Sequence, residues 1–354
     1  MITDPSVFKD DHFATLKHRE GKLSELLRAW EPAASGDTAA DVMLFGPQGV
    51  GKTLLARHGL QRIQHEADVD SAHVGCLGLS TAGILREVLC QLPGEDPYPT
   101  MPKEDLDLTL RERVDEPVIV VLDEADDLPE QNALDRLCEV PKLSVVIVCH
   151  ERARWLSRVS GDVRHRLTGQ EIGLDKYGTE ELADILYARA REGLEYGAVD
   201  RDTLERLADI AGGVARTGIF RLHASAALAE RRRHETIQPP DVDQSAALAN
   251  RWMLENNLAS LGLHHHILYE LIRRSDGLSS SALHDRYTAV ADTVYEGEEL
   301  TPVNQSTRRA KLRKLREYDL VTYTGGENRH GEYLAADSDV KSELDIALPA
   351  SIEV

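Results

Sequence analysis

Between about residue 12 and residue 174, short apolar runs alternate with amphipathic stretches along the chain. This alternation is typical of a parallel sheet flanked by helices, the α/β fold class. One run, Val118–Leu122, is apolar throughout, as expected of a central strand that is covered on both faces. The predicted strands are Val42–Phe45, Ala72–Cys76, Val118–Leu122, Val145–Cys149 and Glu171–Leu174.

The pattern changes after residue 175, where strands are no longer predicted and amphipathic helices follow one another. A helix at Lys103–Arg113 is still expected within the preceding α/β domain, after a proline-rich loop, and we then expect an all-helical domain over residues 175–250. Its own predicted helices are Thr179–Arg191, Asp202–Ala211, Gly218–Arg233 and a further one from Pro239 to Asn250.

A third pattern covers residues 255–337 and predicts three helices followed by two strands with a glycine-rich tip between them. This order of elements is that of a winged helix-turn-helix domain, a fold that often binds DNA. Residues 338–354 form an acidic tail, which we expect to be a frayed end. The predicted elements are His264–Arg274, Ser279–Ala289, Asn304–Tyr318, Leu320–Thr324 and Glu332–Leu334.

The net charge of −20 changes how the chain's partners are judged, because such a charge as a whole repels nucleic acid. Among the 41 basic residues, however, only ten are lysines, a balance that favours adaptation to high salt. In molar salt the repulsion is screened within a few ångströms, so local charge matters more than the total. The absence of an apolar run of membrane-spanning length and of a secretory signal predicts a cytoplasmic protein with no membrane partner.

The segment between the first predicted strand and the next helix fits the phosphate-binding pattern G-x-x-x-x-G-K-[ST]. Its glycines allow backbone N–H groups to turn towards phosphate oxygens, and the helix that follows adds its positive dipole end. Lys52 is expected to reach the terminal phosphates and the Thr53 hydroxyl to bind Mg²⁺. The predicted nucleotide-binding residues here are Gly46, Pro47, Gln48, Gly49, Val50, Gly51, Lys52, Thr53 and Leu54.

The central strand Val118–Leu122 ends in two acids, Asp123 and Glu124. This position places Asp123 at the carboxyl edge of the sheet, where Mg²⁺ is bound together with Thr53. Glu124 is then placed to act as the base that polarises an attacking water. The pair predicts hydrolysis of ATP to ADP as well as nucleotide binding.

The segment Gln305–Arg316 holds six basic residues and no acid. On a helix, Arg309, Arg313 and Arg316 share one face, while apolar residues lie on another. Such a helix fits a duplex groove, with Arg308 beside it and Arg329 contacting phosphate or the minor groove from the predicted wing. The alternative is a solvated basic face that balances nearby acids.

Taken together, the motifs resemble the archaeal origin-recognition and cell-division-control (Orc/Cdc) family of AAA+ replication initiators, over nearly the whole chain. The segments that carry the resemblance are His18-Arg19-Glu20, Leu44-Phe45 before the phosphate loop, Asp123-Glu124-Ala125-Asp126, Val163-Arg164-His165-Arg166-Leu167, Lys176-Tyr177 and Gly213-Val214-Ala215-Arg216. The resemblance implies an AAA+ core, a helical lid and a winged helix. It also implies that Arg166 reaches a neighbouring subunit's nucleotide and that Arg216 and Tyr177 contact the chain's own. His150 takes the position at which the family usually has an asparagine that orients the lytic water.

The function implied by this resemblance is ATP-dependent binding of double-stranded DNA at replication origins. Partners implied are a replicative helicase and further copies of the chain on DNA. The sequence features also allow two alternative functions. One is a switch ATPase whose winged helix docks a protein, and the other is a transcription regulator with the same ATPase core.

Overall fold

The computed structural model describes residues 1–128, 132–297, 300–325, 331–344 and 346. The chain forms two compact units, Met1–Ser245 and Ala246–Val354. Each unit has its own packing.

The first unit contains a five-stranded sheet whose order is β2-β3-β4-β1-β5. All neighbouring strands are parallel, so their carboxyl ends lie at one edge. The strands are β1 (Val42–Phe45), β2 (Asp70–Gly75), β3 (Val118–Asp123), β4 (Leu143–Cys149) and β5 (Glu171–Gly173). The prediction of a parallel five-stranded α/β domain is therefore confirmed.

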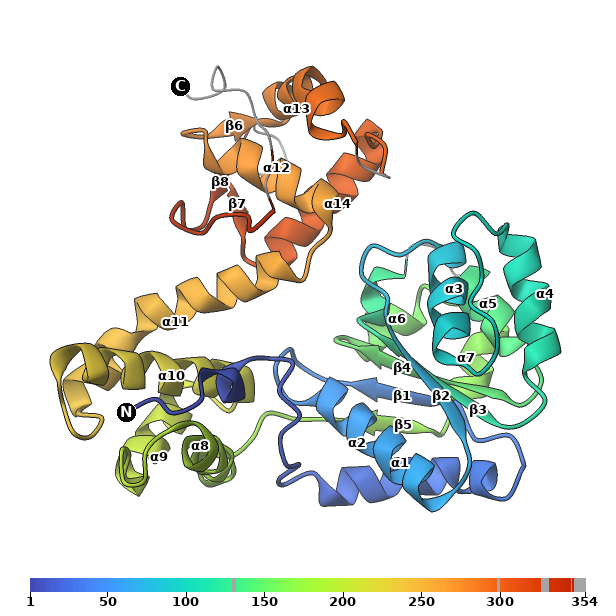
Figure 1. Ribbon diagram of the computed structural model, residues 1–354, viewed down its shortest axis with the longest axis horizontal. Helices are drawn as coiled ribbons and strands as arrows, with labels where there is room; N and C mark the ends of the chain where they lie inside the picture. The colour runs from blue at the N-terminus through green and yellow to red at the C-terminus, as the bar shows by residue number, and fades with distance from the viewer. Residues whose placement is uncertain (129–131, 298–299, 326–330, 345, 347–354) are drawn as a thin grey trace. The chain divides into compact units, whose positions relative to one another are not determined.

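Helices cover both faces of this sheet, as Figure 1 shows. One face packs against α1 (Glu20–Ala34) and α2 (Lys52–Glu66). The other packs against α3 (Thr81–Gln91), α4 (Lys103–Arg113), α5 (Asn132–Cys138), α6 (Arg152–Leu156) and α7 (Gly161–Leu167). Successive strand residues point to opposite faces. Val120 of β3 accordingly belongs to one core cluster and its neighbour Val121 to the other.

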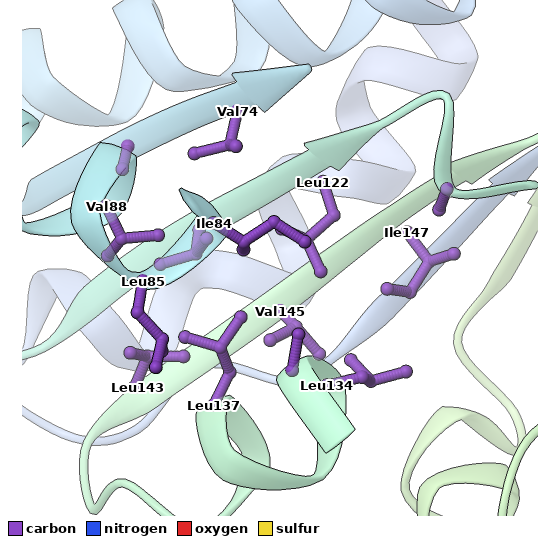
Figure 2. Packing of buried hydrophobic residues seen from close by; sticks show 14 of the residues in the cluster. Val74, Ile84, Leu85, Val88, Leu122, Leu134, Leu137, Leu143, Val145 and Ile147 are labelled. Carbon is purple, nitrogen blue, oxygen red and sulfur yellow. The ribbon is translucent and has the colours of Figure 1, made fainter. Parts of the chain in front are cut away.

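Figure 2 shows the second of these faces, where α3 contributes Leu85 and α5 contributes Leu137 to the same buried cluster as Val145 and Ile147 of β4. Every residue of β3 and β4 is buried. The central strands are therefore held rigidly, and the residues that follow them are fixed at the sheet edge.

Four helices follow the sheet within the first unit, although the last of them continues into the second unit. They are α8 (Thr179–Gly193), α9 (Arg201–Ile210), α10 (Ala215–Arg232) and the beginning of α11 (Pro239–Ala259). The short helix η1 (Pro5–Phe8) lies beside α10 (Figure 1) and joins the apolar core of this helical part. The predicted all-helical part is present, but the participation of the amino-terminal residues was not expected.

The second unit contains α12 (Leu263–Arg273), α13 (Ser280–Val294) and α14 (Gln305–Glu317), with three short strands. The strands β6 (Leu278–Ser279), β7 (Val321–Tyr323) and β8 (Glu332–Ala335) form an antiparallel sheet of order β6-β8-β7. Strand β6 was not predicted, because two residues are too short to give a periodic pattern.

Two sequence-based expectations are wrong. Helix α11 does not end at Asn250 but continues to Ala259, because no glycine or proline interrupts the chain there. The expected frayed end after Asp337 is packed on the second unit as far as the described residues go. Val340 is fully buried, and Tyr269 Oη donates a hydrogen bond to its carbonyl oxygen over 3.1 Å.

No helix within the described parts of the chain is both long and apolar enough to cross a membrane.

Candidate nucleotide site and basic helix

The phosphate loop lies directly after β1, at the carboxyl edge of the sheet, and ends where α2 begins. Gly46 has φ +148°, and a Cβ there would lie 2.2 Å from the carbonyl oxygen of Leu174. Gly49 has φ +75°, and a Cβ would lie 2.8 Å from Cβ of Arg216. Both positions therefore require glycine, so that the loop can pass between β5 and the helical part. In the rest of the loop, Pro47 and Gln48 are exposed, Val50 is buried, and Gly51 and Leu54 are half-buried.

Lys52 begins α2 and folds back over the loop. Its Nζ donates hydrogen bonds to the carbonyl oxygens of Gly46 and Pro47, each over 2.8 Å. Burial lowers the pKa of Lys52, while the nearby carboxylate of Asp123 opposes this shift. The ammonium group is thus held at the centre of the loop, where a phosphate would lie.

Asp123 and Thr53 are brought together at the sheet edge, as the sequence predicted. Burial alone would raise the pKa of Asp123, but hydrogen bonds from His73, Thr53 and the Glu124 backbone hold it below its usual value. The largest of these favourable contributions comes from His73 on β2, whose Nε2 is 3.2 Å from Asp123 Oδ2. Sequence reasoning missed His73, because the register between β2 and β3 is decided only in the sheet.

Glu124 follows Asp123 in a left-handed backbone conformation, with φ 52° and ψ 41°. Its backbone N–H donates to Asp123 Oδ1 over 2.9 Å, so the two acids are locked together. A non-glycine residue in this conformation costs about 1 kcal/mol or more, and such outliers gather at functional sites. The turn directs the chain away from the sheet immediately after the acid pair.

His150 lies directly after β4, at the same edge as the phosphate loop, because Phe45 and Cys149 are in register. Its backbone N and its Nδ1 both lie 2.7 Å from Oδ2 of Asp126. A carboxylate accepts hydrogen bonds, so Nδ1 is the donor. Burial would raise the pKa of Asp126, but the hydrogen bonds from His150 keep it below its usual value. Asp126 is a second partner that the sequence did not reveal.

The helical part meets the phosphate loop at Arg216, near the start of α10. The backbone N–H of Arg216 donates to the carbonyl oxygen of Gly49 over 3.2 Å. Its side chain forms an ion pair with Asp10, with 2.7 Å between Nη2 and Oδ2. The predicted proximity of Arg216 to the phosphate loop is therefore present, but the partnership with Asp10 was unforeseen.

Tyr177 and Arg19 form a second contact next to the loop. The guanidinium of Arg19 stacks on the Tyr177 ring, 3.9 Å from its centroid, and also donates to the carbonyl oxygen of Asp175. A Cβ on Gly51 would lie 3.3 Å from the Tyr177 hydroxyl. Tyr177 thus lies against the phosphate loop, as expected, and Arg19 orients it.

Arg166, at the end of α7, lies at the other end of β1 from the phosphate loop. Its Nε donates to Oδ2 of Asp41, the residue before β1, over 2.5 Å. Its Nη1 donates to the carbonyl oxygen of Cys138. Arg166 is therefore not brought to the nucleotide site of its own chain.

In the second unit, α14 exposes Arg309, Arg313 and Arg316 on one face and buries Leu312 and Leu315 on another. The amphipathic arrangement expected for this helix is present. Arg308 differs from the other arginines of the predicted DNA-binding group. It donates to the carbonyl oxygen of His284 over 3.0 Å and stacks on Tyr287, 4.6 Å from the ring centroid.

Arg308 therefore fixes α14 to α13, a packing role that was not expected, and its predicted contact with DNA stays a prediction. Arg329, the predicted wing contact, lies outside the described residues.

The residues at the sheet edge suit a nucleotide with a magnesium ion. Mg²⁺ prefers oxygen ligands, and the Thr53 hydroxyl and the Asp123 carboxylate lie within one hydrogen bond of each other. The loop glycines turn the backbone around the Lys52 ammonium, which supplies positive charge for phosphate. Both parts of the expected ligand therefore match the donor groups that are present.

Two family models match the chain in the order of these parts. An AAA ATPase domain matches residues 15–148, and a Cdc6 AAA+ ATPase-type lid domain matches residues 183–247. The "ORC1-type DNA replication protein 9" of Halobacterium salinarum is 28% identical over 349 residues, which is 97% of this chain and 96% of the relative. The "ORC1-type DNA replication protein 3" of Haloarcula marismortui is 26% identical, covering 92% of each chain.

Solved structures agree on the fold. The ORC1 protein of Aeropyrum pernix in complex with DNA superposes with a TM-score of 0.73 at 23% identity, covering 96% of this chain and 95% of that one. The ORC2 protein of the same organism, in ADPNP–ADP complexes, gives a TM-score of 0.61 at 22% identity, covering 96% of each chain. The phosphate loop, the acid pair, the lid and the relatives matched over nearly the full length lead to one conclusion. The chain belongs to the Orc1/Cdc6-type family of AAA+ replication initiators.

Proposed function

We propose that the protein binds ATP and Mg²⁺ in its first unit and double-stranded replication-origin DNA through its second unit, and so regulates the initiation of replication. In this proposal residues 12–174 are the nucleotide-binding core and residues 175–250 the lid. Residues 255–337 are a winged helix, and 338–354 are an acidic tail whose described part packs on the second unit.

One observation carries the nucleotide half: Asp123, at the end of β3, is hydrogen-bonded to Thr53 of the phosphate loop. Lys52 would neutralise the terminal phosphates, while Thr53 and Asp123 would hold the metal, which withdraws charge from the phosphate oxygens. Arg216 would contact the third phosphate from the lid. Arg166, on the far edge of the sheet, would act only on the nucleotide of a neighbouring copy.

Hydrolysis to ADP follows if Glu124 acts as the base for the attacking water. The His150 ring is fixed by its Nδ1–H donation to Asp126. An imidazole held in this way differs in reach and geometry from the asparagine amide that the resemblance leads us to expect at this position. We therefore propose slow turnover, in which the bound nucleotide acts mainly as a switch.

The DNA half is supported by the exposed arginine face of α14 in a chain whose total charge is −20. The antiparallel three-stranded sheet behind α14 and the docked apolar face of this helix fit a winged helix that presents α14 to a groove. The relatives are named DNA replication proteins, and the structurally similar ORC1 protein was solved in complex with DNA. Partners would be origin DNA, further copies of the chain and the replicative helicase.

The nucleotide half is tested by Lys52→Ala, which should abolish binding of a fluorescent ATP analogue in the presence of Mg²⁺. The matched control is Lys22→Ala, since Lys22 is a half-buried lysine on α1 that pairs with Glu25. Unchanged affinity in Lys52→Ala would show that the loop does not bind nucleotide.

The DNA half is tested by Arg309→Gln combined with Arg313→Gln in the full chain. If both side chains contact phosphate, the double variant should bind duplex more weakly, with a salt dependence whose slope falls by about 2. The matched control is Arg231→Gln with Arg233→Gln, which removes two exposed arginines of the lid. Equal effects of the two pairs would reject α14 as the DNA-binding helix.

A switch ATPase that docks a protein through an apolar surface would hold its partner as salt rises, whereas DNA contacts weaken. Mapping the binding sites of the protein on the chromosome distinguishes origin binding from the remaining alternative, a transcription regulator. A few sharp sites support an origin function, and occupancy of many promoters supports transcription regulation.

A further inference from the structure

The amino-terminal fourteen residues form a strap, residues 1–14, that contacts both the lid and the helix behind the phosphate loop. On the lid side, Val7 and Phe8 are 3% and 1% exposed and belong to the lid's apolar core. Phe8 stacks on His223 of α10, with 4.7 Å between ring centroids, and Arg189 of α8 donates to the carbonyl oxygen of Val7 over 2.7 Å. This half of the strap is therefore anchored to the lid.

The other half of the strap is anchored to α2, the helix that the phosphate loop opens. Phe13 stacks on His58, with 4.3 Å between ring centroids, and the Arg57 guanidinium lies over the Phe13 ring, 5.0 Å from its centroid. The ring nitrogen Nε2 of His58 lies 2.8 Å from the carbonyl oxygen of Ala14. Both ends of the strap are thus fixed on either side of the nucleotide site.

Asp10 lies between these two anchors, and its carboxylate pairs with Arg216 over 2.7 Å. The Arg216 side chain is 16% exposed and that of Asp10 is 40% exposed, so the pair lies partly inside the molecule. Arg216 is also the lid residue whose backbone N–H donates to Gly49 of the phosphate loop. An acid of the strap therefore holds an arginine that the lid brings to the phosphate loop.

We propose that Asp10 is a specificity-determining residue that shifts the preference of the site away from a nucleoside triphosphate and towards a diphosphate. The inference rests on the proposed nucleotide site and adds a residue that acts on it through Arg216. A third phosphate would need the Arg216 guanidinium, which can bind carboxylate and phosphate oxygens alike. A diphosphate leaves the pair with Asp10 intact.

The strap keeps the Asp10 carboxylate close to Arg216, so Asp10 and a third phosphate compete for the same guanidinium. Asp10 is two residues from Phe8 and three from Phe13, both of which are packed against other parts of the unit. Its carboxylate cannot move far when a phosphate takes its place, so the two anionic groups remain close and repel each other. Triphosphate binding is therefore opposed by Asp10, whereas diphosphate binding is not.

The test is Asp10→Asn in the full chain, with the affinities for ADP and for a non-hydrolysable ATP analogue measured in the presence of Mg²⁺. The affinity for the triphosphate should rise about three- to fivefold, the factor that corresponds to one partly exposed ion pair, while that for ADP stays nearly constant. Asp11→Asn is the matched control, because it removes the same charge from the adjacent exposed residue. An equal change for both nucleotides, or the same change in Asp11→Asn, overturns the inference.

A second measurement asks whether Asp10 acts through Arg216. In an Arg216→Ala background, the gain in triphosphate affinity produced by Asp10→Asn should shrink. The guanidinium for which Asp10 and the third phosphate compete is then missing. A gain of undiminished size overturns the assignment. If wild-type protein and Asp10→Asn bind neither nucleotide, the proposed function fails and this inference fails with it. Binding with an unchanged triphosphate-to-diphosphate ratio overturns this inference alone.

Discussion

At the scale of single residues, Asp123 depends on a neighbour that no motif contains. His73 Nε2 lies 3.2 Å from Asp123 Oδ2, and this contact helps to keep the carboxylate ionised and oriented. Groups that hydrogen-bond to a metal ligand commonly contribute a factor of ten or more to metal affinity. In the proposed site, His73 would therefore support Asp123 as a metal ligand through this contact.

We expect His73→Ala to raise the Mg²⁺ concentration needed for nucleotide binding about tenfold, because the carboxylate loses a partner that orients it. A magnesium titration of fluorescent-nucleotide binding measures the change. His65→Ala, which alters an exposed histidine on α2, serves as the control. A magnesium requirement equal to that of the control would contradict the role given to His73.

A second residue-scale prediction concerns the pH dependence of the second unit. Burial lowers the pKa of His265 from its usual 6.5 to about 3. The unfolded chain then binds a proton below pH 6.5 that the folded unit does not. The stability contributed by the neutral ring is therefore present above that pH and is lost as the pH falls towards 3.

Between pH 7 and pH 5 this single group should cost about 2 kcal/mol of unfolding free energy. His265→Leu should remove that part of the pH dependence. Urea unfolding of wild type and variant at the two pH values provides the measurement. Parallel losses of stability in the two proteins would show that His265 does not titrate in this way.

At the scale of elements, the decisive contact joins the phosphate loop to the start of α10. A Cβ on Gly49 would lie 2.8 Å from Arg216 Cβ and 2.9 Å from Val214 Cγ1, and φ at Gly49 is +75°. Neither neighbour is the far end of a flexible chain. The loop and the lid can therefore approach this closely only with glycine at position 49.

Gly49→Ala should weaken nucleotide binding about tenfold or more, because the new methyl group strains the loop and pushes α10 away. Fluorescent-nucleotide titration measures the affinity. Gly21→Ala is the matched control, since Gly21 is inside α1 with nothing within 4 Å of its added Cβ. If both substitutions leave the affinity unchanged, the contact between loop and lid does not matter for binding.

The elements themselves were largely predictable from sequence, and α14 shows where prediction stops. Its apolar and basic faces follow from a helical period that the sequence contains. The partners of Arg308, on α13, do not, because they lie 20 or more residues away along the chain. The basic face was therefore foreseen, whereas the role of Arg308 in packing was not.

At the scale of the whole molecule, the chain consists of two compact units. The proposed nucleotide site lies in the first unit. A ligand that binds the folded form stabilises only the unit that holds its site. Nucleotide binding should therefore affect the two units unequally.

We expect calorimetry of the full chain to resolve two unfolding transitions. An ATP analogue with Mg²⁺ should raise the midpoint temperature of only one of them. Lys52→Ala should abolish that shift without altering the other transition. A single transition that moves as a whole with nucleotide would show that the units unfold together.

The sequence by itself determined the features whose signals are local. The apolar strands, the phosphate loop, the acid pair at the end of β3 and the basic face of α14 each follow from spacing within a few residues. Backbone geometry and side-chain chemistry act over such distances without reference to the rest of the fold. These parts were correct in kind, and their boundaries shifted by only a few residues apart from the end of α11.

Only the tertiary structure decided which distant groups meet. Asp10 pairs with Arg216, His73 with Asp123, and Val340 is buried in the second unit, although nothing in their local sequence requires it. Such contacts depend on strand register and on how helices pack, which the whole chain determines together. The phosphate loop was therefore evident from eight residues, whereas the acid that holds its arginine became visible only in the folded molecule.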